Sequence, residues 1–217
     1  MKIGVIIAMD IEYRCMHDAL GGDTGRLGNN DIVLGRCGIG KVNAAIGTLQ
    51  LIEQHHPDAI VSTGLAGGID SQLDVMDIIA ASQAVYHDVW CGMGCEMGQI
   101  QGLPTRFDAD AHLLATAQST PTEGHLVKGL ICTGDQFITD RNALDEIKRK
   151  FPDGLACDME SAAIAHTCYQ LKMPFLSLRV VSDTPGRTDN HQMQWDDFLN
   201  SMCDRSFHFV RLFLETC

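Results

Sequence analysis

The stretch Lys2-Ile-Gly-Val-Ile-Ile-Ala8 decides the fold class, because it is an almost unbroken run of apolar residues. A strand with one solvent-exposed face alternates apolar and polar residues, whereas this pattern indicates burial on both faces. Such burial requires helices on both sides of the sheet. The run is too short to span a membrane, and Asp10 and Glu12 follow it directly. The sequence therefore predicts an α/β fold of three layers, α/β/α.

Short β-branched runs alternate with longer helical patterns along the rest of the chain, which supports the same fold class. The expected strands are Lys2–Ala8, Ile32–Arg36, Ala59–Thr63, Asp77–Val85, Leu126–Thr133 and Phe175–Val181. The expected helices are Ile11–Leu20, Lys41–His56, Asp110–Gln118, Arg141–Lys150, Asp158–Leu171 and Asp196–Glu215. The second helix carries apolar residues in a 3.6-residue rhythm at Val42, Ala45, Ile46, Leu49 and Ile52. Without a repeat or a linker, 217 residues suit a single domain over residues 1–217.

The composition argues against several classes of partner. A formal net charge of −12 would repel a phosphate backbone, so we expect no nucleic acid. No uncharged apolar run reaches membrane length, so we expect no membrane partner. We expect the nine cysteines to be reduced thiols, because Cys132, Cys157 and Cys168 lie in apolar segments where free cysteine behaves as a small hydrophobe. Reduced thiols favour a cytoplasmic protein.

Two glycine-containing stretches follow expected strands. Gly38-Ile-Gly-Lys41 is similar to part of a phosphate loop, but its spacing fits neither the nucleotide-triphosphate motif nor the dinucleotide fingerprint. A tight strand-to-helix turn explains it better. Gly64-Leu-Ala-Gly-Gly68 is explained equally well by a turn or by close approach of a ligand to the backbone.

His87, Cys91 and Cys95 are spaced four residues apart, and zinc accepts ligands of these types. Glycines in the same segment argue against the helix that would align them, and no fourth ligand is evident. The sequence therefore predicts no metal site, and nothing in it implies an organic cofactor.

Carboxylates follow or end three apolar runs: Glu12, the pair in Asp158-Met-Glu160, and Asp183 after Ser182. Each has an ordinary explanation, since acids in a first helical turn are favoured by the helix dipole and aspartate is common in caps and turns. Ends of different strands can nevertheless converge on one cleft. A shared site is therefore a hypothesis that the structure can examine.

Seven motifs occur in order along the chain: MKIGVIIAMDIE (1–12), CGIGKVNAA (37–45), STGLAGGID (62–70), AVYHD (84–88), GDQFI (134–138), CDMESAAIAH (157–166) and RVVSD (179–183). Together they resemble the purine nucleoside phosphorylase/nucleosidase superfamily, and within it most of all the 5′-methylthioadenosine/S-adenosylhomocysteine nucleosidases. The resemblance implies a mixed, partly barrel-like central sheet surrounded by helices. It also implies hydrolysis of a 5′-substituted adenosine to adenine and a free ribose derivative, without a cofactor.

The resemblance further implies which residues carry the reaction. Glu12 would activate the attacking water, Asp183 would protonate N7 of the leaving adenine, and Arg179 would lie near the water and the 3′-hydroxyl. Glu160 would hold the ribose hydroxyls. Adenine leaves poorly until its ring nitrogen is protonated, and water must attack the opposite face of the sugar, so two carboxyl groups are needed as in inverting glycosidases.

The other implied contacts are with the base, the sugar and the 5′-substituent. Phe137 would stack on adenine, and the backbone of Ile138 would read the edge of the base. The residues implied to pack on the sugar and the 5′-substituent are Met9, Ile39 and Met159.

Three positions depart from the family pattern. Leu65 stands where a small hydroxyl residue is usual, which keeps a futalosine hydrolase or another purine nucleosidase as an alternative. Trp90–Gln99 resembles a loop that reaches into the neighbouring subunit, so the resemblance implies a homodimer in which Met97 contacts the partner's site. Trp195 falls where an aromatic residue covers the 5′-group, and we expect it to form a mobile lid with Pro185–Gln194.

Two further functions stay open on the sequence. A phosphorylase would replace water by phosphate, but Glu12 would repel phosphate, and Ala8-Met-Asp-Ile-Glu12 stands where the phosphorylases carry a phosphate-binding motif. A protein that binds nucleosides without cleaving them is supported only by Leu65. Under all these hypotheses the partner is a small nucleoside.

Overall fold

A computed structural model describes residues 1–122, 124–184 and 207–217 of the chain. Five strands close into a barrel, because each pairs with the next and the last pairs with the first. In order around the barrel they are β4 (Ala59–Gly68), β8 (Gly154–Asp158), β7 (Leu126–Thr133), β5 (Ile78–Tyr86) and β9 (Phe175–Asp183). Both parallel and antiparallel pairs occur, so the expected mixed, partly barrel-like sheet is confirmed.

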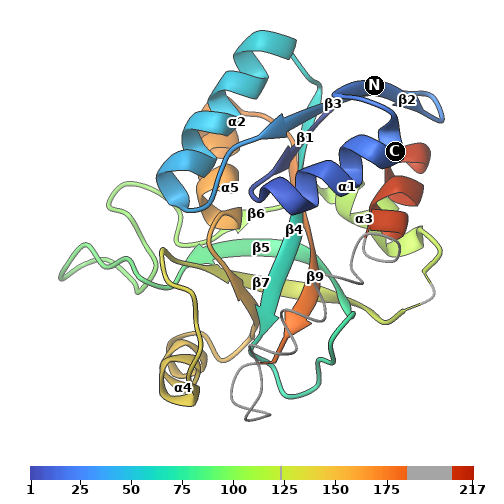
Figure 1. Ribbon diagram of the computed structural model, residues 1–217. Helices are drawn as coiled ribbons and strands as arrows, with labels where there is room; N and C mark the ends of the chain where they lie inside the picture. Colours follow the sequence, from blue (N-terminus) through green and yellow to red (C-terminus); the bar gives the residue numbers. More distant parts are fainter. Residues whose placement is uncertain (123, 185–206) are drawn as a thin grey trace.

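The remaining strands of the described residues extend this sheet on either side of the barrel (Figure 1). β1 (Lys2–Ile7) pairs in parallel with β4 and with β3 (Asn30–Arg36). β2 (Thr24–Leu27) forms a hairpin with β3, and β6 (Phe107–Asp108) pairs with β5. The opening apolar run therefore lies inside the sheet, with a neighbouring strand on each side.

Helices cover both faces of β1. The helices of the described residues are α1 (Asp10–Leu20), α2 (Lys41–His55), α3 (Ala111–Ser119), α4 (Arg141–Lys150) and α5 (Ser161–Leu171), and residues 207–216 are also helical. Ile3 and Ile7 pack in a cluster with residues of α1, α3 and the C-terminal helix. Ile6 packs on the opposite face with residues of α2 and α5, which lie side by side in Figure 1. Within the described ranges, no helix has the length and apolar character needed to cross a bilayer.

The elements that sequence reasoning missed are short. β6 has two residues, and β8 has five. The helix expected over Asp158–Leu171 is wrong at its start, because Asp158 ends β8 beside Thr133 of β7 and the helix begins at Ser161. The strand runs into the helix without a turn signal, so the two could not be separated by pattern. The helix expected over Asp196–Glu215 lies mostly outside the described residues.

The apolar rhythm of α2 marks a face that its own chain leaves uncovered. Val42, Ile46 and Leu49 are exposed, with 68% of the surface of Val42 accessible. The helix instead packs inward through its smaller residues and one leucine, namely Ala44, Gly47, Thr48 and Leu51. The 3.6-residue pattern therefore predicted the helix correctly, although its most apolar stripe faces outward.

The cysteines agree with expectation at most described positions. Cys132, Cys157 and Cys168 are buried free thiols, as their apolar surroundings in the sequence indicated. Cys15 is disulfide-bonded, so the expectation that every thiol is reduced is wrong at that position.

One buried side chain joins the first strands to the C-terminal helix. The Asn30 amide group donates to the carbonyl oxygens of Leu214 and Cys217, both at 2.9 Å. Its oxygen accepts a hydrogen bond from the amino group of Met1 at 3.0 Å. Asn30 is 1% exposed, so water cannot replace these bonds.

Replacing Asn30 by alanine is expected to lower the free energy of unfolding by about 2 kcal/mol, because buried carbonyl groups lose their donor. Asn29 is the matched control, since it is the exposed neighbour in the same turn. We expect Asn29→Ala to stay within about 0.5 kcal/mol of the wild type. Urea unfolding of the three proteins measures this, and equal midpoints for the two variants would contradict the role of Asn30.

Candidate active site

A cavity opens where the barrel strands and β1 end, the edge of an α/β sheet at which ligands bind. Its lining comes from the segments that follow β1, β3 and β7, the second half of β4, and the ends of β8 and β9. Ten residues named from the sequence line it: Met9, Glu12, Ile39, Leu65, Phe137, Ile138, Met159, Glu160, Arg179 and Asp183. The carboxylates of three separate sequence regions thus reach one cavity.

Glu12 lies in the first turn of α1 and is buried, with 2% of its surface exposed. One carboxylate oxygen accepts from the Leu65 N–H at 2.9 Å, and the other accepts from the Met9 N–H at 3.1 Å. Burial raises the pKa of Glu12, although these two hydrogen bonds and the nearby Arg179 charge oppose the rise. A carboxylate whose pKa is raised is a better proton acceptor near neutral pH.

Gly64 leaves the space that the Glu12 carboxylate occupies. A Cβ atom on residue 64 would lie 2.8 Å from Oε1 of Glu12, and the φ angle of +153° suits glycine. The turn that Gly64–Gly68 could have formed is absent, because these residues continue β4 and pair with β9. A group does approach the backbone closely here, and it is the Glu12 side chain of the protein itself.

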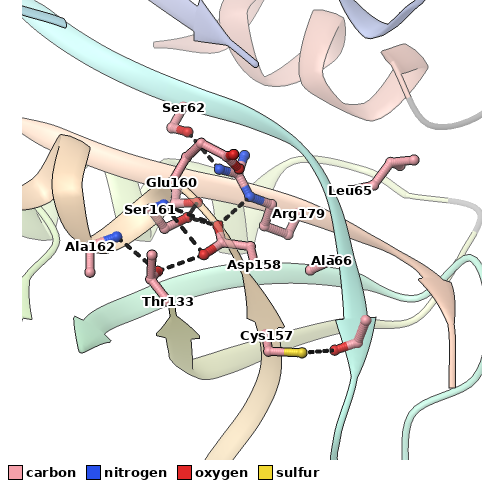
Figure 2. A network of polar contacts seen from close by, with 12 residues as sticks. Ser62, Leu65, Ala66, Thr133, Cys157, Asp158, Glu160, Ser161, Ala162 and Arg179 are labelled. Carbon is pink, nitrogen blue, oxygen red and sulfur yellow. Dashed lines mark hydrogen bonds and ion pairs between the residues drawn. The ribbon is translucent and has the colours of Figure 1, made fainter. Parts of the chain in front are cut away.

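Asp158 is the centre of a buried polar network at the end of β8 (Figure 2). Its carboxylate accepts from the Thr133 hydroxyl at 2.5 Å, from the Ser161 N–H at 3.1 Å and from the Ser161 hydroxyl. It also accepts from Nε of Arg179 at 2.8 Å. The cap that the sequence suggested is present in the Ser161 contact, but sequence reasoning missed the ion pair with Arg179.

Arg179 enters the cavity from the middle of β9 and is 2% exposed. Besides the bond to Asp158, its Nη2 donates to the Ser62 hydroxyl of β4 at 2.9 Å. Its third nitrogen, Nη1, is buried and has no hydrogen-bond partner among the described residues. A buried donor without a partner costs about 1–3 kcal/mol, so this nitrogen is ready for an oxygen atom of a ligand or of water.

Glu160 occupies the N-cap position of α5, but its side chain makes no capping bond to that helix. Its carboxylate instead accepts from the Gly40 N–H of the turn before α2, at 2.9 Å. Burial and the neighbouring Asp158 charge raise the pKa of Glu160 to about 7, while Arg179 and the Gly40 N–H lower it. The plain capping role is therefore wrong for Glu160, which reaches across to another element.

Asp183 ends β9 and is 3% exposed at the cavity wall. The Ser182 hydroxyl donates to its Oδ1 at 2.6 Å and also lies 3.3 Å from the carbonyl oxygen of Ala66. These contacts hold one oxygen of the Asp183 carboxyl group, which faces the same cavity as Glu12.

Two of the apolar lining residues are accessible from outside the cavity, whereas others are enclosed. Phe137 and Ile39 are each about half exposed, at 52% and 51%. Ile138 and Leu65 are buried, and Figure 2 shows the Leu65 side chain directed away from the Asp158 network.

Among the described residues named from the sequence, Met97 does not line this cavity. Met97 is half-buried against an apolar cluster of its own chain, which includes Val85 and Phe151. Trp195 and the segment Pro185–Gln194 lie outside the described residues. The proposed contact of Met97 with a partner subunit and the proposed lid therefore stay predictions.

A comparison with protein families gives a match over nearly the whole chain. The model of the phosphorylase superfamily matches residues 5–215. A 5′-methylthioadenosine/S-adenosylhomocysteine nucleosidase from Neisseria meningitidis, solved in complex with methylthio-immucillin-A, is 31% identical with a TM-score of 0.92. The match covers 100% of this chain and 99% of that chain.

Two further solved structures are similar over almost their full length. S-adenosylhomocysteine nucleosidase from Streptococcus pyogenes, in complex with 5-methylthiotubericidin, is 34% identical with a TM-score of 0.90, covering 99% of this chain and 96% of that one. A 5′-methylthioadenosine/S-adenosylhomocysteine nucleosidase from Colwellia psychrerythraea, in complex with adenine, is 35% identical with a TM-score of 0.89. That match covers 100% of this chain and 96% of the other.

The raised pKa of Glu160 predicts a pH-dependent loss of stability. The folded chain holds this proton up to about pH 7, whereas an unfolded chain releases it near the ordinary value of 4.5. The folded state thus binds more protons between these pH values, and the free energy of unfolding falls as pH rises through the window. We expect Glu160→Gln to be more stable than the wild type at pH 8 by about 1–3 kcal/mol, with little difference at pH 4.5.

Thermal unfolding of both proteins at several pH values measures this difference. The exposed carboxyl of Glu53 on α2 provides the control, and we expect Glu53→Gln to follow the wild-type curve. A Glu160→Gln protein that is less stable than the wild type at pH 8 would show that the buried carboxylate is stabilising, contrary to this account.

Proposed function

This chain belongs to the phosphorylase superfamily and, within it, to the 5′-methylthioadenosine/S-adenosylhomocysteine nucleosidases, and on that premise we propose that it hydrolyses a 5′-substituted adenosine. The products are adenine and a free ribose derivative. The observation that carries the proposal is the shared cavity of Glu12, Glu160 and Asp183, three carboxyl groups that come from separate strand ends.

In the proposed reaction, Asp183 acts as the general acid. The bond between C1′ of the ribose and N9 of adenine breaks, its electron pair moves into the base, and N7 takes the proton of Asp183. The hydrogen bond from Ser182 supports this role, because it holds one carboxyl oxygen in place. A positioned general acid contributes roughly 10²–10⁴-fold to such a rate.

Glu12 acts as the general base in this proposal. The water oxygen bonds to C1′ while its proton passes to the Glu12 carboxylate. The two N–H groups that hold this carboxylate fix both of its oxygens, so it can accept a proton without a change of rotamer. Its raised pKa favours the acceptance of that proton.

Glu160 and Arg179 hold the sugar. An ionised Glu160 would accept hydrogen bonds from the ribose diol and would favour the positive charge that develops on the ring. The unpartnered Nη1 of Arg179 would donate to the water or to the 3′-hydroxyl. Asp158 keeps the guanidinium in this orientation through its bond to Nε.

The apolar wall of the cavity receives the base and the 5′-substituent. Phe137 stacks on adenine, and stacking on a base contributes about 1–3 kcal/mol in other nucleobase sites. The backbone of Ile138 reads the base edge. The residues that contact the sugar and the 5′-substituent are Met9, Ile39, Leu65 and Met159.

The reaction with water is favoured over phosphorolysis by the charge of the cavity. Phosphate would have to approach four carboxyl groups, those of Glu12, Asp158, Glu160 and Asp183, with only the Arg179 guanidinium among the lining residues to attract it. The N–H of Gly40 at the start of α2, a natural anion site, is already bonded to Glu160.

Replacing Asp183 by asparagine is expected to reduce kcat for adenine release from methylthioadenosine by about 10²–10⁴-fold, because the base then leaves without a proton donor. Asp145→Asn on α4 is the control, since that carboxyl group is exposed and pairs with a neighbouring arginine of the same helix. Free adenine and the sugar product are measured with and without phosphate.

Two outcomes would oppose the proposal. An Asp183→Asn protein with the wild-type rate would exclude Asp183 as the acid. A wild-type rate that rises with phosphate, with a sugar 1-phosphate as product, would make the protein a phosphorylase.

We further propose that the protein is a homodimer that uses the exposed face of α2. Val42, Ile46 and Leu49 form an apolar stripe on this helix, and Met93 in the loop after β5 is 99% exposed. Ile39 precedes the stripe and lines the cavity, so a second copy on this face would lie next to the cavity mouth. Exposed apolar surface of this kind is typical of protein interfaces.

Replacing Ile46 by glutamate is expected to convert the dimer to monomers, because the substitution places a charge at the centre of the stripe that the dimer would bury. Gln50→Glu adds the same charge to an exposed polar position of α2 and should leave the dimer intact. Sedimentation equilibrium measures the mass of each protein. A monomeric wild type, or a dimeric Ile46→Glu protein, would contradict this interface.

A further inference from the structure

A polar cluster outside the cavity joins three elements that meet at its mouth. We call Lys41, Asp88 and Asp135 the clamp; they lie at the start of α2, after β5 and after β7. The Lys41 ammonium contacts both Asp88 oxygens at 2.7 and 2.9 Å. The Asp135 carboxylate accepts from the Lys41 N–H at 2.8 Å, and the Asp135 N–H donates to Asp88 at 3.0 Å. Each member thus bonds the other two.

The clamp is one residue away from the group that holds Glu160. Gly40, whose N–H donates to the Glu160 carboxylate, precedes Lys41. Gly40 has a φ of +93°, and a Cβ atom there would lie 3.1 Å from an Asp135 carboxylate oxygen. Asp135 therefore lies directly against Gly40, and its bond to the Lys41 N–H holds the peptide group that follows the one bonded to Glu160.

Asp135 also anchors the segment that carries the aromatic ring of the cavity, through its carboxylate to the Lys41 N–H and through its own N–H to Asp88. Phe137 lies two residues after Asp135. The base of this segment is fixed by the bond from the Gly134 N–H to the Asp158 carbonyl oxygen at 3.1 Å. The clamp holds its outer part through the Asp135–Asp88 bond. Phe137 itself is half exposed.

The ion pair of the clamp is a weak source of overall stability. The Lys41 and Asp88 side chains are 22% and 20% exposed, and exposed or partly exposed pairs contribute about 0–1 kcal/mol. Its contribution to stability is therefore small, and its position between two cavity walls is the better guide to its role.

We propose that Asp135, through Lys41 and Asp88, is a positioning residue that sets Glu160 and Phe137 in register with one another across the cavity mouth. The inference rests on the proposed function for the identity of the ligand, a purine nucleoside, but the geometry that it describes can be tested without catalysis. Asp135 touches neither the reacting atoms nor, in this proposal, the substrate.

Loss of the Asp135 charge and loss of its positioning role would shift the pKa of Glu160 in different directions. The charged and titratable groups that act on Glu160 are Asp158 of β8, Arg179 of β9, Glu12 of α1 and Cys37 after β3. Removing a further negative charge would by Coulomb interaction alone lower the pKa of Glu160 or leave it unchanged. Loosening the Gly40 N–H bond would raise it, because that bond favours the ionised carboxylate.

The experiment compares Asp135→Ala, Asp135→Asn and Asp70→Ala in the full chain. Asparagine keeps an oxygen that can accept from the Lys41 N–H. Asp70 is the matched control, because it also accepts from one backbone N–H, that of Gln72, and pairs with one lysine, Lys148, at 2.7 Å. Asp70 does not line the cavity. Circular dichroism and thermal unfolding establish that each variant is folded.

Two quantities are measured. The first is the pKa of Glu160 in the free protein, from the side-chain carboxyl carbon in a ¹³C NMR titration, assigned by its absence in Glu160→Gln. The second is the pair kcat and KM for adenine release from methylthioadenosine. In Asp135→Ala we expect the pKa to rise by about 0.5–1 unit, a fraction of the effect of one hydrogen bond to a charged group. We expect KM to rise about 5–10-fold with kcat within about twofold, as for a loss of ground-state binding.

Asp135→Asn should recover most of both effects, and Asp70→Ala should match the wild type. A lower or unchanged pKa in Asp135→Ala, together with an unchanged KM, would overturn the proposal. A merely structural role would reduce kcat through a smaller folded fraction and would leave the pKa and KM as they are. If the wild type released no adenine, the proposed function would fail while the NMR titration would still test the clamp.

Discussion

The buried ion pair between Asp158 and Arg179 is the constraint on which the rest of the cavity depends. Its two side chains are 1% and 2% exposed, and two charges removed from water to this extent are stable only when their other bonding positions are filled. Thr133 and Ser161 fill those of Asp158, and Ser62 takes one nitrogen of Arg179. The pair therefore joins β4, β7, β8, β9 and α5 at one point. Closure of the sheet into a barrel is what brings these elements together, and the remaining nitrogen of Arg179 has no hydrogen-bond partner among the described residues.

Backbone N–H groups near helix starts have a consistent use in this protein. A helix start normally attracts anions, and the turn before α2 has some likeness to a phosphate loop. Here the N–H groups of Met9, Gly40 and Lys41 bond to the carboxylates of Glu12, Glu160 and Asp135. The anions at these helix ends are thus supplied by the chain. The helix starts orient carboxylates around a space that suits a sugar acquiring positive charge, and they are less suited to a phosphate ion.

Much of this arrangement could be predicted from the sequence, and the rest failed for identifiable reasons. The apolar runs indicated the long strands, and the motifs at their ends named ten residues that line the cavity. β8 was missed because five residues run directly into a helix. The role of Asp158 was missed because an acid before a helix is explained by capping, and its pairing with Arg179 depends on barrel closure. Periodicity located α2 but could not tell which face is covered, since an apolar stripe looks the same against a core or against solvent.

Gly64 limits which substitutions related chains can accept at this position. Its missing side chain is required because the Glu12 carboxylate fills the same space and because other residues rarely adopt a φ of +153°. A lineage that retained the acidic residue would find every larger residue at this place selected against, however well the strand tolerated it. Once the acidic residue was lost, the steric part of that selection would end and only the backbone conformation would still favour glycine. A bulkier residue there would thus indicate, in a genome sequence alone, a descendant in which the carboxylate no longer lies beside this strand.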